Sequence, residues 1–388
     1  MKRRHCLKLM AGCAMIPLLP FTESYANNRA STSRKRLILL ELSGANDGLN
    51  TVVPYSDDRY YELRPSIGLG PDRLIKLNNN FALNASLKQA MPLWESAQLA
   101  IVHGLGYPSP NRSHFKSIAL WETGGDGNVA GRHGWATHDL EHAYASSHVD
   151  AHGIVLGGGM GIFSSPGGNW LSMSAADQFS NRRVVANHTH KAVNDTMALL
   201  LDRAKVLKSS LDNISRKVAL NKKRVQIHGG DLSDQMTHAV NIINSGINVP
   251  VIKLSLNGFD THDQQTYKHQ SLLSQVARAI SGMRRELIKS GEWNNTVLLT
   301  YSEFGRRARE NKSHGTDHGT AAAHFLCGGR INGGMYGTAP DLGQLIDDDL
   351  QHTMDYRAVY SRLLNDWLEL PSNSFAKFTD DRLNHLIS

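Results

Sequence analysis

Cysteine is scarce in this sequence, and so are long apolar runs and clusters of positive charge. Two of the three cysteines, Cys6 and Cys13, lie in a stretch that we interpret as a cleaved signal peptide, so only Cys327 would remain and no intramolecular disulfide could form. Cys327 ends the apolar run Ala321–Cys327, which predicts a buried, inert thiol. The apolar run Leu9–Phe21 is too short to span a bilayer, so we expect no stable membrane insertion. No basic stripe with interleaved aromatic residues occurs, which argues against nucleic acid as a partner.

The N-terminus has the features of a twin-arginine export signal. Arg3 and Arg4 precede an apolar leucine and a lysine, a modest apolar run follows, and Ser24–Ala26 is a small-x-small cleavage site. We therefore expect residues 1–26 to be a signal peptide and the protein to be periplasmic or otherwise exported through this pathway. The alternative is a cytosolic protein with a frayed basic end.

The remaining chain has the composition of a globular protein, with 40% hydrophobic and 20% charged residues in the sequence of 388. Residues 27–35 are polar, and we expect them to be a mobile leader. Residues 36–388 are long enough for one large α/β domain. Residues 122–190 are rich in glycine and histidine with weak periodicity, which favours an insertion or cap.

Near-continuous apolar runs alternate with helical periodicity along this part of the chain. Such runs are typical of strands that are covered on both faces of a parallel sheet. The pattern predicts an α/β fold with a mostly parallel central sheet flanked by helices. The expected strands are residues 37–42, 98–103, 249–256, 296–301 and 322–326, and the longest expected helices are Ala192–Ala219 and Leu272–Ser290.

Acidic and histidine residues follow several of the expected strands. Open α/β sheets bind ligands beyond the carboxyl ends of their strands, so these side chains could converge. Carboxylates mixed with imidazoles suit zinc, manganese or iron. The candidate metal ligands are Asp47, Asp260, His262, Glu303, Asp317 and His318.

Each candidate ligand also has a structural alternative. Asp47 can shape the turn before Gly48, and Asp260 can cap a following helix. Glu303 can pair with one of the next two arginines, and His318 can hydrogen-bond a backbone carbonyl. The recurrence of such residues at several strand ends favours the metal interpretation for the set.

A candidate nucleophile precedes the short helical segment Phe115–Trp121. Ser113 would lie at the start of that helix, where backbone amides and the helix dipole favour an anion. Arg112 and His114 flank the serine and could steer a small anionic substrate. The alternative role for Ser113 is that of a helix cap.

Five longer motifs stand out in the sequence, namely Glu41–Thr51, Asn111–Phe115, Phe259–His262, Ser302–Arg307 and Gly315–Gly319. They resemble those of the DUF1501 family of exported bacterial proteins, and the resemblance extends over nearly the whole chain after the signal. The family is similar in fold to the alkaline phosphatase and sulfatase superfamily, and its own activity is largely undefined. The resemblance thus implies an alkaline phosphatase-like fold.

The resemblance also implies roles for individual residues. Asp47 corresponds to the first metal-binding aspartate and Ser113 to the nucleophile. Asp260 with His262 corresponds to the aspartate–histidine pair of the other metal. Glu303 falls where the superfamily has an aspartate, and His318 corresponds to the late histidine ligand.

Two departures from the superfamily pattern limit what the resemblance implies. Phe304 stands where the superfamily has a second histidine, so one metal site loses a nitrogen ligand. The sulfatase signature would place its modified cysteine or serine at Pro108, which cannot become formylglycine. One or two divalent ions, or none, are therefore compatible with the motifs.

The leading hypothesis is an exported metal-dependent hydrolase of phosphate- or sulfate-type esters, in which Ser113 attacks and Arg112 and His114 steer the anion. A second hypothesis is a non-catalytic binding or assembly protein with an exported protein partner, and Phe304 motivates it. A third is a purely structural calcium site around Asp47, which the histidines disfavour.

Overall fold

The five predicted strands form the middle of one large sheet in the computed structural model, which describes residues 34–127, 129–145, 149–165, 167–173, 194–222, 224–339 and 341–388. The predicted signal peptide, most of the predicted leader and residues 174–190 of the predicted cap lie outside the described residues. The strands are β1 (Arg36–Ser43), β5 (Leu99–Gly106), β8 (Val251–Asn257), β9 (Thr296–Tyr301) and β10 (Ala322–Gly328).

The sheet is mostly parallel, as predicted. Its order is β11-β5-β10-β9-β1-β8-β6-β7, and β12 pairs with β5. The strands from β9 to β7 in this order run parallel to one another, whereas β10 is antiparallel to both β9 and β5. The additional short strands are β6 (Gly153–Val155), β7 (Trp170–Ser172), β11 (Gly334–Tyr336) and β12 (Met354–Asp355).

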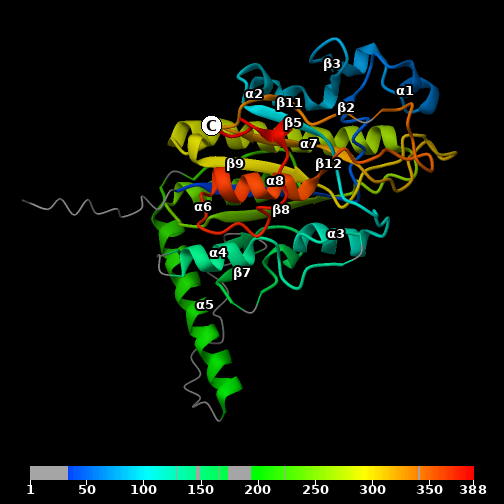
Figure 1. Cartoon of the computed structure of the whole chain (residues 1–388). Coiled ribbons are helices and arrows are strands. Elements are labelled where there is room, and N and C mark those ends of the chain that lie inside the picture. The colour runs from blue at the N-terminus through cyan, green and yellow to red at the C-terminus, as the bar shows by residue number, and fades with distance from the viewer. Residues whose placement is uncertain are drawn as a thin grey trace, which may run out of the picture. The chain divides into compact units, whose positions relative to one another are not determined.

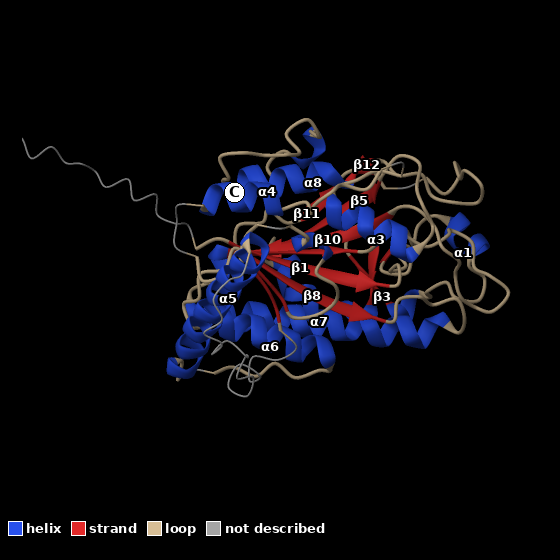
Figure 2. Ribbon diagram, turned by 90° about the horizontal axis from the view of Figure 1, so that it is seen from below, coloured by secondary structure: helices blue, strands red, loops and turns tan. Residues whose placement is uncertain are grey.

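Helices cover both faces of the sheet, so that the fold has three layers (Figures 1 and 2). Ile38 and Leu40 of β1 belong to the core shared with α6 (Asp231–Asn244) and α7 (Gln265–Ser290). The alternate residues Leu37 and Leu39 belong to a second core, which includes residues of α3 (His114–Thr123), α4 (Thr137–Tyr144) and α8 (Tyr356–Arg362). This double burial explains why the strands are near-continuous apolar runs.

The segment predicted as a cap, residues 122–190, contributes to the main sheet. It supplies α4 as well as β6 and β7, and β6 pairs in parallel with β8. The next helix, α5 (Asp195–Leu220), agrees with the predicted helical stretch, and the side chain of Asn194 caps it by accepting a hydrogen bond from the Met197 N–H.

A smaller sheet lies between β1 and β5 in the sequence. It has the order β2-β4-β3, with strands β2 (Val52–Val53), β3 (Leu74–Lys76) and β4 (Ala82–Asn84). The helices of this region are α1 (Asp58–Leu63) and α2 (Met91–Glu95). A third buried cluster, which includes Val53 and Tyr60, packs this region against Ala308 and Ala321 from the loop between β9 and β10.

The fold brings the ends of three central strands to one edge of the sheet. Ser43 at the end of β1 pairs with Asn257 at the end of β8, and Glu41 pairs with Tyr301 at the end of β9. The loops that follow these strands therefore start side by side, and they carry most of the candidate site residues. Among the described residues, no helix has both the length and the apolar character that a bilayer crossing requires.

Candidate metal centre

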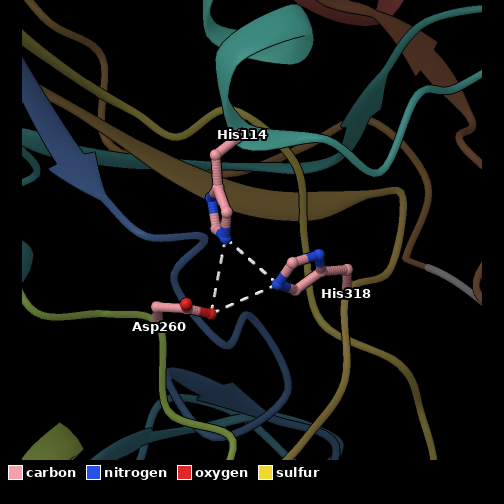
Figure 3. Close-up of side chains that lie close together, drawn as sticks. All are labelled: His114, Asp260 and His318. Carbon is pink, nitrogen blue, oxygen red and sulfur yellow. Dashed lines mark hydrogen bonds and ion pairs between the residues drawn. The ribbon is translucent and has the colours of Figure 1, made fainter.

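Three histidines and one aspartate meet beyond this edge of the sheet. His114 is the first residue of α3, Asp260 and His262 lie in the loop after β8, and His318 lies in the loop between β9 and β10. Figure 3 shows His114, Asp260 and His318 pointing toward one another. Their ligand atoms all lie within 4.8 Å of one another. Residues separated by about two hundred positions in the sequence thus form one cluster.

The imidazole Nε2 atoms gather around a single carboxylate oxygen, Oδ1 of Asp260. The distances to this oxygen are 3.4 Å from His114, 3.0 Å from His262 and 3.2 Å from His318. Nε2 of His318 also lies 3.0 Å from Nε2 of His114 and 2.8 Å from Nε2 of His262. We call these four residues the histidine–aspartate cluster.

Each imidazole of the cluster is held through its other nitrogen by an acceptor. Nδ1 of His114 lies 2.7 Å from Oε1 of Glu303, and Nδ1 of His262 lies 3.0 Å from Oδ1 of Asp317. Nδ1 of His318 lies 2.8 Å from the carbonyl oxygen of Arg112. For His114 and His318 the Nδ1 contact is shorter than the Nε2 contact to Asp260, so we assign the proton of each neutral ring to Nδ1, and we assign the same tautomer to His262, whose Nδ1 has Asp317 as acceptor. The Nε2 lone pair of His318 then faces the Nε2 lone pairs of His114 and His262.

Such an arrangement fits a divalent metal ion. Lone pairs at 2.8–3.0 Å repel unless a cation or a proton lies between them. Three imidazole nitrogens and one carboxylate oxygen are a common donor set for zinc, and ligating histidines usually donate their other N–H to a carboxylate or carbonyl. The side chains of the four residues remain 25–46% exposed, so an ion and a small ligand could reach them from solvent.

Arg306 also contacts the cluster, although no sequence pattern placed it in the candidate site. Its buried guanidinium donates to Oδ1 of Asp260 at 2.5 Å, and it also donates to backbone carbonyls of the loop after β1, of Phe259 and of Thr316. It therefore ties together the three loops that surround the cluster. The available signal was its place in the Ser302–Arg307 motif, directly after a predicted buried strand. A charged side chain that is buried at such a position needs a partner of opposite charge.

The side-chain pKa values of the cluster are shifted in different directions. Burial raises the pKa of Asp260, but the hydrogen bond and charge of Arg306 outweigh it and hold the pKa below its usual value. The hydrogen bond to Glu303 raises the pKa of His114, against the effect of burial. Burial lowers the pKa of His318, and the charge of Arg306 adds to this effect. Asp260 is thus an anion, and its neighbour His318 favours the neutral form that can bind a metal.

Glu303 lies behind His114 in the structure, and its carboxylate is buried. Oε1 accepts from His114 and from the Gly44 N–H, and Oε2 lies 3.3 Å from the Ser302 hydroxyl. Burial raises its pKa, but the hydrogen bond from His114 and nearby backbone N–H groups bring it below the usual value. Glu303 therefore orients the His114 ring and Asp317 orients the His262 ring. Neither carboxylate lies among the ligand atoms of the cluster.

Asp47 has other partners. Its Oδ2 accepts from Arg64 at 2.6 Å and from Gln265 at 2.5 Å, and its Oδ1 accepts from the backbone N–H groups of Leu49 and Asn50. The side chains of Asp47 and Arg64 are at most 1% exposed. Burial raises the pKa of Asp47, but the charge of Arg64 outweighs it and lowers the pKa. Asp47 is thus neutralised by an arginine and shapes the turn after β1.

Ser113 and Arg112 lie directly before the first residue of α3. Ser113 is the N-cap residue by position, but its side chain makes no capping hydrogen bond. Arg112 donates to the buried carboxylate of Asp349 at 2.9 Å and remains 36% exposed.

Phe304 is buried, and its ring lies 4.9 Å from the rings of both His114 and His318. The residue that departs from the superfamily pattern therefore packs against the cluster as an apolar wall.

The fold and the cluster define a class: an α/β protein with a candidate mononuclear metal centre. A family model described as a protein of unknown function, DUF1501, matches residues 180–368, which include Asp260, His262, Glu303, Asp317 and His318. This match confirms the resemblance over the three motifs that lie in this range, Phe259–His262, Ser302–Arg307 and Gly315–Gly319. No curated protein matches the sequence.

Several solved structures resemble this chain at low identity. The lipoteichoic acid synthase LtaP from Listeria monocytogenes is 10% identical with a TM-score of 0.40, and the match covers 91% of this chain and 76% of that chain. The C-terminal periplasmic domain of EcEptC from Escherichia coli, in complex with Zn, is 10% identical with a TM-score of 0.39, at 91% and 86% coverage. The PsFucS1 sulfatase from Pseudoalteromonas sp. is 12% identical with a TM-score of 0.36, at 82% and 67% coverage. At these TM-scores the likenesses do not bear on the chemistry of this chain.

Proposed function

We propose that this protein is an exported hydrolase of phosphate- or sulfate-type esters that depends on one divalent metal ion. The observation that carries the proposal is the convergence of three imidazole Nε2 atoms on Oδ1 of Asp260, with an acceptor behind each ring. The ligands would be His114, His262, His318 and Asp260. Zinc, manganese and iron all accept nitrogen and carboxylate donors, and zinc suits this four-ligand set best.

A divalent ion in such a site polarises a phosphoryl or sulfuryl oxygen and lowers the pKa of a nearby hydroxyl. The chain itself would supply the nucleophile and the positioning groups. The hydroxyl of Ser113, free of a capping hydrogen bond, is next in sequence to the ligand His114. The first turn of α3 offers backbone N–H groups and the positive end of the helix dipole to an anion.

Arg112 would steer the substrate. Among the described residues, only Nη2 of Arg112 has a side-chain partner, Asp349, so donors of the planar guanidinium remain for an oxyanion. The pairing to Asp349 limits the freedom of the side chain and places its charge beside Ser113. A small anionic ester would thus lie between Arg112, the start of α3 and the metal ion.

The partners of Asp47 support one ion rather than two. A second ion would need Asp47 or Glu303 as a ligand, but both carboxylates already have donors, with Arg64 on the first and His114 on the second. Arg64 would have to leave a buried ion pair to release Asp47, which costs several kcal/mol.

Metal analysis of the purified full-length protein tests the metal centre. We expect one zinc, manganese or iron ion per chain in the wild type and a loss of most of it in His318→Ala. Elemental analysis by mass spectrometry, with circular dichroism as the control for folding, gives the result. A folded wild type that never retains stoichiometric metal, even after incubation with each of the three ions, would contradict the proposal.

An ester screen tests the activity. Nitrophenyl phosphates and nitrophenyl sulfates are suitable probes because the nitrophenolate that they release is coloured. We expect the wild type to cleave one of these two classes. Ser113→Ala should remove nearly all of that activity while the metal content stays unchanged. Ser109→Ala, in the same loop but away from the helix start, is the matched control. Equal activity of the two variants would exclude Ser113 as the nucleophile.

The predicted export signal is the basis for proposing an exported location. Replacing Arg3 and Arg4 by lysines keeps the charge but removes the twin-arginine pattern. We expect the wild-type protein in the periplasmic fraction of its host and the variant in the cytoplasm. Identical fractionation of the two would rule out this route.

The ion pair between Arg306 and Asp260 favours a second candidate function, that of a non-catalytic binding or assembly protein. Oδ1 of Asp260 already has a cationic partner at 2.5 Å, which allows a cluster that holds loops in place without metal. This candidate predicts that Ser113→Ala leaves the biological phenotype intact and that an exported protein partner co-purifies with the chain.

A further inference from the structure

A row of polar side chains lies inside the fold, on the face of the sheet that α3 covers. Glu41 of β1 is in register with Ser255 of β8 on one side and with Tyr301 of β9 on the other. Residues in register on neighbouring parallel strands point to the same face. His324 of β10 and Trp121 of α3 extend the row, because the Trp121 ring lies 6.1 Å from the Tyr301 ring and 5.7 Å from the His324 ring. All five residues are buried.

The polar atoms of this row have no hydrogen-bond partner among the described residues. These atoms are the Trp121 Nε1, the Ser255 Oγ, the Tyr301 hydroxyl and the His324 Nδ1. Buried polar groups are paired in nearly all native proteins, and a group left unpaired loses the free energy of its hydration. Four such atoms along one row of neighbouring residues therefore point to bound partners, rather than to four separate defects.

Charge in the same region is also unbalanced. Nζ of Lys253 is fully buried and lies 2.9 Å from Oε2 of Glu41 and 2.6 Å from Oε1 of Glu122. One ammonium thus faces two carboxylates. Burial raises the pKa of Glu41, Lys253 lowers it, and the charges of Glu122 and Glu303 raise it further. The region holds an excess of negative charge that hydrogen-bond donors would stabilise.

The chemistry of the row identifies the partner. An anion would be repelled by the carboxylates, and a metal cation would leave the Trp121 N–H unpaired because an indole can only donate. Water both donates and accepts. A bridging water can therefore pair with each of the four atoms, none of which has a hydrogen-bond partner among the described residues.

We propose that this row is an internal water site, in which ordered water molecules bridge Ser255, Tyr301, His324 and Trp121 beside the Lys253 ion pairs. The site lies one step inside the sheet from the loops of the histidine–aspartate cluster, since Tyr301 precedes Glu303 by two residues. The water would solvate the excess charge behind Glu303. This inference is independent of the proposed hydrolase activity.

Tyr301→Phe tests the water site because a bonded and an unbonded hydroxyl give opposite results. If water bonds the hydroxyl, its removal breaks a hydrogen bond and lowers the melting temperature Tm. If the hydroxyl is dry and unpaired, its removal relieves a penalty and raises Tm. Tyr360→Phe is the matched control, since the equally buried Tyr360 hydroxyl donates to the Trp121 carbonyl oxygen at 3.0 Å.

We expect Tyr301→Phe to lower Tm about as much as Tyr360→Phe does. An unchanged or raised Tm for Tyr301→Phe would overturn the inference. A crystal structure of the wild type at high resolution provides a measurement that does not depend on the variant. Water density within hydrogen-bond distance of the Tyr301 hydroxyl and of His324 Nδ1 supports the site, and an empty, dry interior there overturns it.

Discussion

Nδ1 of His114 lies 2.7 Å from Oε1 of Glu303, and this contact joins the first turn of α3 to the residue that follows β9 by two positions. A buried carboxylate thereby fixes the ring orientation of a histidine whose Nε2 points into the cluster. Outer partners of this kind set the tautomer and the basicity of a ligating imidazole. The contact explains why a glutamate that lies outside the cluster still matters to it.

Replacing Glu303 by alanine should weaken metal binding without removing a ligand. We expect the affinity for zinc to fall roughly 10- to 100-fold, because His114 loses the acceptor that holds its Nδ1 proton. Competition with a chromogenic chelator measures the affinity. Glu303→Gln is the matched control, since its amide oxygen can still accept from His114, and it should lose less. An unchanged affinity in a folded Glu303→Ala protein would show that this contact does not serve the metal.

Much of the fold could be predicted from the sequence because the strand residues of both cores form apolar runs in it. The five predicted strands are all present, since each is covered by helices on both faces. The start of α7 was missed by seven residues. The N–H groups of Gln264 and Gln265 donate to the carbonyls of Ser313 and His314, so a distant loop supplies the cap and no local signal marks it.

The site was predictable where it depends on strand ends and not where it depends on tertiary pairing. The structure brings Asp260, His262 and His318 together, as expected from loops at one edge of a parallel sheet. The place of His114 in the cluster and the neutralisation of Asp47 by Arg64 have no local signature. Both depend on tertiary contacts, because His114 must reach Asp260 and Arg64 must reach Asp47 from other elements of the fold.

Asp47→Asn and Asp260→Asn form a matched pair, because each aspartate follows a central strand and contacts an arginine. Asp47→Asn should destabilise the protein by about 3–5 kcal/mol, since it leaves the buried Arg64 without a counter-charge, and should leave the metal content unchanged. Asp260→Asn should lower the metal content. Urea denaturation and elemental analysis measure the two effects. Loss of metal in a folded Asp47→Asn protein would place Asp47 in the metal centre.

Acid should weaken the fold through buried neutral histidines. Burial lowers the pKa of His103 from 6.5 to about 4, and its Nε2 has no partner among the described residues. The unfolded chain therefore binds a proton below pH 6.5 that the folded protein does not, so the stabilising contribution is complete above pH 6.5 and is lost as the pH falls toward 4.

His103→Leu should remove this part of the pH dependence. Between pH 6 and pH 4.5, its free energy of unfolding should fall less steeply than that of the wild type, by up to about 1.4 kcal/mol per pH unit. Urea denaturation at several pH values gives the slopes. The exposed His228→Leu is the control and should follow the wild type. Parallel slopes for all three proteins would mean that His103 is protonated in the folded state.

Lys253 should support both the fold and the metal centre, because its ammonium connects β8 to α3. Nζ pairs with Glu122 in the last turn of α3, whereas His114 occupies the first turn of the same helix. Lys253→Met leaves two buried carboxylates without a cation, and we expect a loss of about 3–5 kcal/mol in the free energy of unfolding.

Lys217→Met is the control for this prediction, since Lys217 pairs with the buried Asp150 at 2.5 Å but is 30% exposed and lies on α5, away from α3. Its loss of stability should be smaller, and its affinity for zinc should equal that of the wild type. Lys253→Met should in addition bind zinc more weakly, because α3 is no longer held against the sheet and His114 moves with it. Chelator competition on protein that circular dichroism shows to be folded separates the two effects. If the two variants lose equal stability and both keep full zinc affinity, the ion pair at Glu122 does not position the histidine, and the Glu303 contact alone fixes His114.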